Sequence, residues 1–279
     1  MGPLRGKTVA ITEARRAAEL ATLIAKLGGV PYSAPAVREV PRLDRAPALD
    51  VLDRICRGEV GVVVFLTGVG TRAFLSLAAE AGKREGLLQA LAGMVVAARG
   101  PKPIAVLREA AVRIDLVPRE PTSEGLLRAF AEADYEVRGK VVAVQLYGEE
   151  NPFLVEGLRA RGATVLEIPL YEWALPENQE PLIRLVHDLL CGGIDVLAFT
   201  SSPQIKHVFS VATHLGLGER LLAALRGPVT VAVVGPICRA TVSGLGIVPR
   251  IQSDKNTMGA LVHAISDYLA DQEEHYARS

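Results

Sequence analysis

The sequence predicts an α/β protein built from two similar units, each with a doubly wound and mostly parallel sheet. The first observation is an internal repeat: Arg5-Gly6-Lys7 precedes one apolar run as Arg138-Gly139-Lys140 precedes another, and equivalent features stay 133 to 135 residues apart along the chain. The second is an alternation of short β-branched runs with longer helical patterns, which is typical of parallel sheets covered by helices. The third is that the runs are continuously apolar, as strands buried on both faces are.

The individual elements follow from these patterns. Strands are expected at 8–12, 61–66, 94–98, 141–145, 195–200 and 229–234. Helices are expected at 15–27, 69–81, 101–110, 123–133, 151–161, 203–216, 236–244 and 257–270, and the polar residues from Asp271 onward are expected to fray. Two proline-bounded segments at equivalent places, 35–41 and 168–176, are too irregular for helix, and we interpret them as the linkers between two domains.

Composition restricts the class of protein. With 279 residues, 49% of them hydrophobic, the chain can bury two cores of ordinary domain size. Lys+Arg and Asp+Glu balance at 31 each, so no nucleic-acid partner is expected. The sequence has no signal region and no membrane-length apolar run, which predicts a cytoplasmic protein without a membrane partner. Three dispersed cysteines predict mostly buried, reduced thiols, and neither they nor the five histidines have metal-binding spacing.

Small-residue turns follow the predicted strands. In open parallel sheets, ligands bind beyond the carboxyl ends of the strands, and helix starts there present backbone N–H groups to anions. These turns predict a ligand that is anionic at several points, although the same residue types also serve as simple helix caps. The turn residues in question are Thr67, Gly68 and Val69, then Arg99, Gly100 and Lys102, then Tyr147 and Gly148, then Thr200, Ser201 and Ser202, and finally Gly235 and Pro236. Thr257 is a further candidate for binding the ligand, although it fits a helix cap better than a catalytic role.

No strong acid–base machinery is visible in the sequence. No Ser–His–Asp set can be assigned from spacing, and neither the glycine-lysine segment at 2–8 nor the GVG at 68–70 satisfies a nucleotide-binding motif. Tyr171 in the second linker stands where the first repeat has Val37. This departure from the repeat makes Tyr171 a candidate functional residue, with structural packing as the alternative.

Several motifs together resemble the uroporphyrinogen-III synthase family. They are FLTGVGTRAF, ARGPKPIAVLREA, PTSEGLL, AFTSSPQIKHVF, VAVVGP and TMGALVHAI, and their order and spacing extend the resemblance from the strand at 8–12 to about Leu269. The resemblance implies an enzyme that cyclises hydroxymethylbilane, a linear tetrapyrrole, to uroporphyrinogen III, with inversion of ring D and loss of water. It further implies a monomer that needs no metal or cofactor.

The resemblance also implies a fold and a set of roles. Two flavodoxin-like domains, 1–37 plus 173–279 and 38–172, are joined by a two-stranded antiparallel linker, with the substrate between them. The helix starts named above would bind the acetate and propionate groups of the substrate, assisted by Arg15, Arg16, Arg99 and Lys102. Tyr171 matches the tyrosine of the family's linker and would act as the general acid that protonates the departing hydroxyl.

Two positions depart from the family pattern. Thr12-Glu13-Ala14 replaces the usual Thr-Arg-Pro, and Ile237-Cys238 replaces small hydroxyl residues. These departures leave open a non-catalytic tetrapyrrole or small-molecule sensor related to the synthase. A binding protein of the periplasmic type is a third possibility, and the lack of a signal peptide argues against it.

Overall fold

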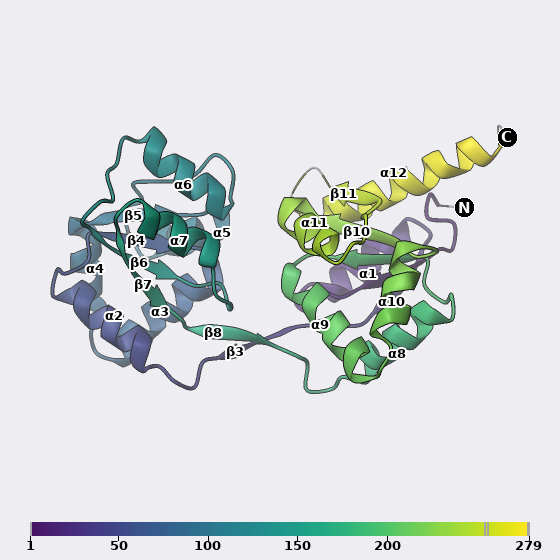
Figure 1. The fold of residues 1–279 in the computed structure, drawn as a ribbon, viewed down its shortest axis with the longest axis horizontal. Helices are drawn as coiled ribbons and strands as arrows, with labels where there is room; N and C mark the ends of the chain where they lie inside the picture. Colours follow the sequence, from purple (N-terminus) through teal and green to yellow (C-terminus); the bar gives the residue numbers. More distant parts are fainter. Residues whose placement is uncertain (1, 254, 256, 278–279) are drawn as a thin grey trace. The chain divides into compact units, whose positions relative to one another are not determined.

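The computed structural model describes residues 2–253, Lys255 and 257–277, and the side chains up to residue 272. The chain divides into two compact units (Figure 1): unit 1 holds the chain up to Arg38 and from Ala174 onward, and unit 2 holds Glu39–Trp173. Strands β3 (Arg38–Pro41) and β8 (Tyr171–Ala174) pair in a two-stranded antiparallel sheet where the chain passes from one unit to the other. The predicted fold class is confirmed.

Unit 1 contains a five-stranded parallel sheet. Its strands are β1 (Thr8–Ile11), β2 (Val30–Ser33), β9 (Val196–Phe199), β10 (Thr230–Val234) and β11 (Ile251–Ser253). Their spatial order is β11-β10-β9-β1-β2, which is the flavodoxin-like order read from the opposite edge. One core packs against α8 (Glu180–Leu190), α9 (Ser202–His214), α10 (Gly218–Arg226) and α11 (Gly235–Gly244), and the other packs against α1 (Ala17–Lys26) and α12 (Met258–Ala277).

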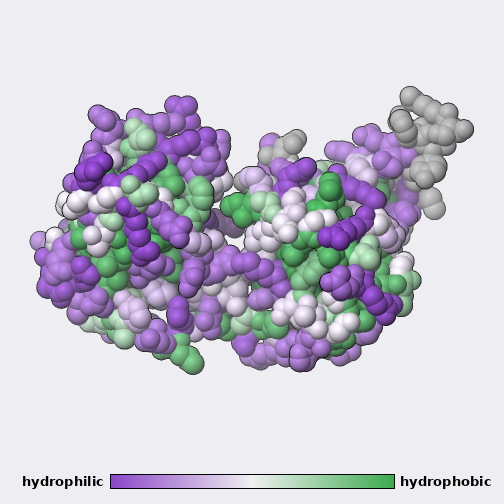
Figure 2. All heavy atoms as spheres, viewed as in Figure 1, coloured by the Kyte–Doolittle hydropathy of each residue, from purple (hydrophilic) through white to green (hydrophobic). Residues whose placement is uncertain are grey.

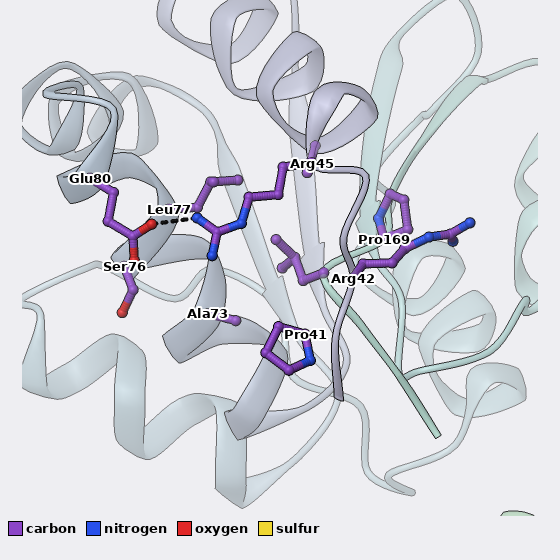
Figure 3. Close-up of a pocket in the computed structure, with 10 residues that line it drawn as sticks. Pro41, Arg42, Arg45, Ala73, Ser76, Leu77, Glu80 and Pro169 are labelled. Carbon is purple, nitrogen blue, oxygen red and sulfur yellow. Dashed lines mark hydrogen bonds and ion pairs between the residues drawn. The ribbon is translucent and has the colours of Figure 1, made fainter. Parts of the chain in front are cut away.

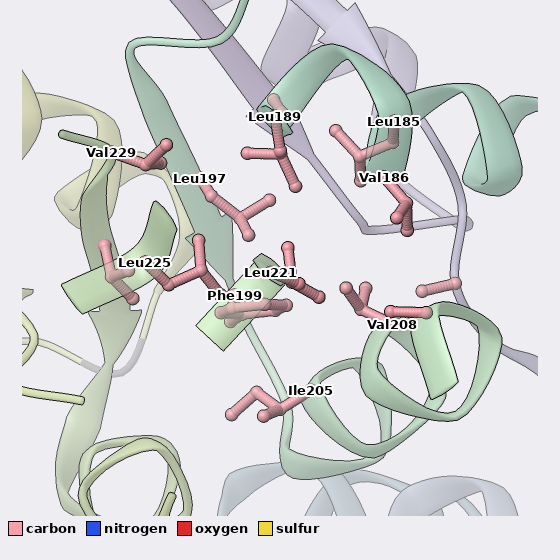
Figure 4. Packing of buried hydrophobic residues seen from close by; sticks show 14 of the residues in the cluster. Leu185, Val186, Leu189, Leu197, Phe199, Ile205, Val208, Leu221, Leu225 and Val229 are labelled. Atoms are coloured by element: carbon pink, nitrogen blue, oxygen red, sulfur yellow. The ribbon is translucent and has the colours of Figure 1, made fainter. Parts of the chain in front are cut away.

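Alternation along each strand divides these two cores. Leu197 and Phe199 of β9 enter the core with α8 to α11, whereas Val196 and Ala198 enter the core with α1 and α12. Figure 4 shows the first of these cores, where Phe199 lies among Leu197, Ile205 and Leu221. Because both faces of the strand are buried, every residue of β9 must be apolar, which explains the continuous apolar run.

Unit 2 repeats this arrangement with four strands. They are β4 (Val62–Phe65), β5 (Val95–Ala98), β6 (Val141–Gln145) and β7 (Thr164–Ile168), in the order β5-β4-β6-β7. All neighbours are parallel, and a single parallel bridge adds Leu116 beside Ala97. One face packs on α2 (Ala46–Cys56), α3 (Gly68–Glu80), α4 (Arg84–Gly93) and α5 (Pro101–Glu109), and the other packs on α6 (Ser123–Glu132) and α7 (Pro152–Ala160).

The predicted strands and helices are present, but the sequence patterns missed several elements. The missed helices α2, α4, α8 and α10 each follow a linker segment or another helix and not a predicted strand, so they fall outside the strand–helix alternation that the sequence shows. Two of the missed strands also lack a long buried apolar run: β2 lies at a sheet edge and is partly exposed, and β11 is three residues long. Helix α12 continues to Ala277, so the prediction that the chain frays from Asp271 is wrong for the residues described.

The face of the molecule shown in Figure 2 is largely hydrophilic. Hydrophilic residues cover much of both units on this face, and hydrophobic residues are interspersed among them. Cys56 and Cys191 are exposed free thiols and only Cys238 is buried, so the prediction of mostly buried cysteines is wrong. Within the described part of the chain, no helix has the length and apolar character that a membrane span needs.

One buried phenylalanine in the core of each unit gives a paired stability prediction. Phe65 and Phe199 occupy equivalent places and are 0% and 1% exposed, so changing either to Ala should cost about 3–5 kcal/mol of unfolding free energy through lost burial and a cavity. Urea unfolding followed by circular dichroism measures the change. Val248→Ala, at a residue that is 76% exposed, is the control and should change stability little. An unchanged midpoint in both Phe variants would contradict the assigned cores.

Candidate functional site

The strand order of each sheet creates a point where a ligand site is expected. Consecutive connections leave in opposite directions between β4 and β6 in unit 2 and between β1 and β9 in unit 1. At the first of these points, Phe65 pairs with Gln145, so the residues after β4 and β6 begin side by side. Thr67 follows one strand and Tyr147 follows the other.

In unit 2, Thr67 links the start of α3 to Tyr171. As the helix N-cap, Thr67 accepts a hydrogen bond from the Gly70 amide at its Oγ1 over 3.1 Å. The same Oγ1 lies 3.1 Å from Tyr171 Oη, and either hydroxyl can donate. Tyr171 is 6% exposed and meets Trp173 edge to face, with ring centroids 5.6 Å apart. The tyrosine that departs from the internal repeat therefore contacts a residue that the turn pattern selected independently.

The turn after β6 packs against the same aromatic pair. Trp173 Nε1 donates to the Tyr147 carbonyl over 2.8 Å. Gly148 has φ of +90°, and a Cβ there would lie 2.6 Å from Trp173 Nε1 and 2.8 Å from the Tyr171 ring. Only glycine fits this position, because any side chain would displace the two aromatic residues.

Arg99, which follows β5, is a partly buried cation without an internal anion. Its guanidinium carbon lies 5.2 Å from the centroid of the Tyr147 ring, and it forms no ion pair with any described residue. Burial lowers the pKa of Arg99. Burial also raises the pKa of Tyr147, as does Glu149, while Arg99 opposes the rise. A desolvated guanidinium that lacks a carboxylate is suited to an anionic ligand.

The first turn of α3 supplies further donors. The Gly68 and Val69 amides have no acceptor within the described residues, and they lie at the positive end of a helix. A Cβ on Gly68 would lie 2.9 Å from the Lys102 carbonyl, so the starts of α3 and α5 pack closely. The prediction of exposed N–H groups is weaker at α5 and α11, because Pro101, Pro103 and Pro236 have no N–H.

In unit 1, the equivalent turn satisfies most of its donors internally. Thr200 Oγ1 donates to Glu13 Oε2 over 2.7 Å, and Glu13 Oε1 accepts from the Ala14 and Arg15 amides. Ser201 forms a capping box with Gln204, and Ser202 Oγ accepts from Thr241. An acidic residue therefore holds this edge of the sheet, where the family pattern would place an arginine.

The remaining predicted residues are distributed along unit 1. Arg16 is exposed and pairs with Glu19, which raises the pKa of Arg16 and lowers that of Glu19 through a side-chain hydrogen bond. Gly235 and Pro236 open α11. Thr257 is exposed and accepts from the Ala260 amide over 3.3 Å, as a helix cap does. The contacts of Thr257 support the capping interpretation.

The sequence patterns missed three residues that shape these edges, Gln145, Trp173 and Gln204, and singled out Glu13 only as a departure from the family pattern. Gln145 accepts from the Leu66 and Thr67 amides, and Gln204 accepts from the Thr200 and Ser201 amides. For Gln145 a sequence signal was available, since it is the single polar residue at the end of the otherwise apolar run VVAVQ. Among the described residues, no group of three or more His, Cys, Asp or Glu side chains has the arrangement of a metal site.

Unit 2 also has a separate concavity of about 200 Å³ (Figure 3). Its walls come from the end of β3, from α2 and α3, and from the turn between β7 and β8. Arg45 crosses it to pair with Glu80, so its one inward cation is neutralised. It shares no residue with the group around Thr67 and Tyr171.

The chain is a two-domain α/β protein. Its two parallel units share one strand order, are connected by a two-stranded antiparallel sheet and have polar turns at the carboxyl ends of their strands. The profile of the family described as "Uroporphyrinogen-III synthase HemD" matches residues 18–263. The chain therefore belongs to the uroporphyrinogen-III synthase family, and the resemblance seen in the motifs is confirmed.

Individual relatives agree with this assignment. A crystal structure of a mutant uroporphyrinogen III synthase from the extremely thermophilic bacterium Thermus thermophilus is 27% identical, with a TM-score of 0.76, and the match covers 96% of this chain and 100% of that one. Uroporphyrinogen-III synthase from Synechococcus elongatus is 27% identical over 62% of this chain and 63% of its own length. "Uncharacterized protein YjjA" of Bacillus subtilis (strain 168) is 29% identical over 97% of this chain and 98% of its own.

The contact between Arg99 and Tyr147 yields a titration prediction. Because Arg99 lowers the pKa of Tyr147, Arg99→Leu should raise that pKa further above its ordinary value. The pKa is read from the pH dependence of the phenolate absorbance, taken as the difference between each protein and its Tyr147→Phe partner. Lys140→Leu removes the cation above Tyr135 and is the matched control, which should leave Tyr147 unchanged. An unaltered titration in Arg99→Leu would contradict the electrostatic contact.

Proposed function

We propose that this protein is an active uroporphyrinogen-III synthase, a lyase that cyclises hydroxymethylbilane with inversion of ring D and loss of water. The family assignment supports the tetrapyrrole substrate. The observation that carries the proposal is the Thr67–Tyr171 contact. It joins two hydroxyl groups in the unit that also holds the unpaired Gly68 and Val69 amides and Arg99, a cation with no ion-pair partner among the described residues.

The carboxylates of the substrate match the donors of unit 2. In the proposal, Arg99 and Lys102 bind acetate and propionate groups together with the Gly68 and Val69 amides, and Val69 and Gly100 shape the two helix starts. Tyr147 and Gly148 form the opposite wall of this edge. The cation–π contact with Tyr147 orients the Arg99 guanidinium without neutralising it, so it can still pair with a carboxylate.

Unit 1 would contribute fewer donors to the same substrate. Arg15 and Arg16 would supply positive charge, and the turn residues Thr200, Ser201 and Ser202 would offer hydroxyl contacts. Gly235 and Pro236 would allow close approach of the ligand to the start of α11, while Thr257 would stay in its capping role. Glu13 reduces the affinity of this edge for carboxylates by like-charge repulsion.

Tyr171 would act as the general acid in the ionising step. The C–O bond of the hydroxymethyl group breaks as the pyrrole nitrogen supplies electrons, and the departing oxygen takes a proton from Tyr171 Oη and leaves as water. Thr67 Oγ1 can then donate to the phenolate oxygen, since it only accepts in its bond with the Gly70 amide and that bond leaves its hydroxyl hydrogen available. The methylene carbon of the azafulvene bonds to the substituted α-carbon of ring D, and the bond from that carbon to its original methylene bridge then breaks. The released methylene bonds to the free α-carbon of ring D, which loses the proton that restores the phenol.

Control of the product would depend on confinement. The cationic azafulvene is reactive enough to close without an enzyme, so the protein must orient the ring and exclude water while the hindered position is attacked. No metal or cofactor enters these steps. A monomeric state and a cytoplasmic location belong to the proposal and can be tested by size-exclusion chromatography and by cell fractionation.

Isomer analysis tests the proposed function. The purified protein is mixed with freshly prepared hydroxymethylbilane, and the oxidised products are separated into isomers I and III. A synthase should give predominantly isomer III at a rate above the spontaneous closure. Isomer I alone at the spontaneous rate would contradict the proposal, and tight product binding in that case would identify the non-catalytic sensor.

Tyr171→Phe tests the role of the phenol. Loss of a general acid should lower turnover to isomer III by about 10²-fold or more while the affinity for uroporphyrinogen III changes little. Phenylalanine retains the ring that packs on Trp173, so folding should be preserved. Tyr135→Phe, at a phenol outside the site, is the control. Unchanged turnover in Tyr171→Phe would leave Tyr171 as a packing residue.

A further inference from the structure

Two buried glutamines hold the equivalent strand-to-helix turns of the two units. Gln145 Oε1 accepts from the amides of Leu66 and Thr67, over 3.2 and 3.1 Å. In unit 1, Gln204 Oε1 accepts from the Thr200 and Ser201 amides, over 2.8 and 3.3 Å. The internal repeat places Leu66 and Thr67 134 residues before Thr200 and Ser201, so one contact is made twice.

The two glutamines reach this position from different places in the repeat. Gln145 ends strand β6 and corresponds to Thr12 after β1, whereas Gln204 lies in α9 and corresponds to Gly70 in α3. Unit 2 therefore combines Gln at the strand end with Gly in the helix. Unit 1 combines Thr at the strand end with Gln in the helix, and Thr12 Oγ1 lies 2.9 Å from Gln204 Oε1.

Space explains why each unit has a single glutamine at the turn. A Cβ added to Gly70 would overlap the side-chain amide of Gln145, so a side chain from the helix and an amide from the strand end exclude each other. Gln145 and Gln204 are 0% and 1% exposed, which means that water cannot replace their contacts. Unpaired buried amides are costly, and some acceptor is required at this turn in both units.

The helix start has a different chemical environment when the glutamine comes from the strand end than when it comes from the helix. Gln204 Nε2 donates to Thr200 Oγ1 over 2.9 Å and lies 3.4 Å from Glu13 Oε2, so it belongs to a network that includes a carboxylate. Gln145 Nε2 instead donates to the carbonyl of Leu146. These contacts of Gln145 hold the start of α3 without a carboxylate among them, which keeps this helix start suitable for an anion.

The Gln145 contact also sets the geometry of Thr67. Its amide is held by Gln145, and its Oγ1 accepts from the Gly70 amide and lies 3.1 Å from Tyr171 Oη. The next two amides, of Gly68 and Val69, continue from the same fixed backbone. A shift of this turn would move the Tyr171 contact and both of these amides together.

We propose that Gln145 is a positioning residue for the cyclisation: its buried carboxamide holds the turn that presents Thr67 to Tyr171. The inference rests on the proposed function, because it assigns Gln145 to that reaction. It also implies that Gly70 is required by the position of Gln145, and that the pair can be exchanged for the Thr–Gln pair of unit 1.

The test transplants one pair into the other unit. Gln145→Thr removes the acceptor of the Leu66 and Thr67 amides and should lower kcat for isomer III about tenfold, with KM changed less than about twofold. The double variant Gly70→Gln/Gln145→Thr rebuilds the unit 1 pair and should return kcat to within about threefold of the parent. Gln252→Thr, the same change at an exposed strand residue, should have no effect.

Amide hydrogen exchange reads the contact independently of turnover. The Leu66 and Thr67 amides should exchange faster in Gln145→Thr and regain protection in the double variant. If Gln145→Thr fails to fold, Gln145→Met fills a similar volume without an acceptor and takes its place.

Parental kcat in Gln145→Thr, or a double variant no better than the single one, would overturn the inference. Should the parent protein form no isomer III, the proposed function fails, and the exchange data still decide whether Gln145 holds the turn.

Discussion

The need to pair buried amides where a strand turns into a helix governs both halves of this protein. A parallel strand buried on both faces can show polar groups only at its ends, and the following helix leaves its first amides unpaired. Gln145 and Gln204 each accept from two amides of the turn that joins the strand to the helix. The amides that remain, at Gly68 and Val69, are then left in a fixed place at the edge of the sheet.

Duplication explains why the same contact occurs twice, and divergence explains why the two edges differ. Both sheets have the same strand order, and α3 and α9 begin at equivalent residues. At the edge of unit 1, Glu13 accepts from Thr200, whereas at the edge of unit 2, Arg99 lies over Tyr147 without an anion. The two halves share a scaffold, while the charge at the edge is reversed.

The fold was predictable because its pattern is periodic. The repeat, the apolar runs and the alternation with helical segments led to two doubly wound units, and the confirmed fold class follows from them. Helices such as α8 and α10 were missed because they follow a linker or another helix and not a predicted strand. Their stability comes from tertiary packing of one apolar face, which the alternation of strands and helices does not reveal.

The candidate site was predictable only in part, for a physical reason. Turn residues such as Thr67 and Gly148 carry a local signature, since glycine and small hydroxyl residues are needed where a turn or a cap forms. Gln145 and Trp173 act through contacts with residues 78 and 26 positions away, and no local pattern shows such contacts. The strand-end glutamine was visible as a polar residue in an apolar run, but its partners were not.

The exchange of Gln between a strand end and a helix suggests how such a site can diverge without unfolding. Adding Gln at position 70 while Gln145 is present would create a clash, and removing Gln145 alone would take the acceptor from the buried Leu66 amide and the partly buried Thr67 amide. Each single step is unfavourable, whereas the two end states are both satisfied. Coupling of this kind preserves the glutamine contact within each half. The charge around the contact can still differ, and it is negative at Glu13 in unit 1 and positive at Arg99 in unit 2.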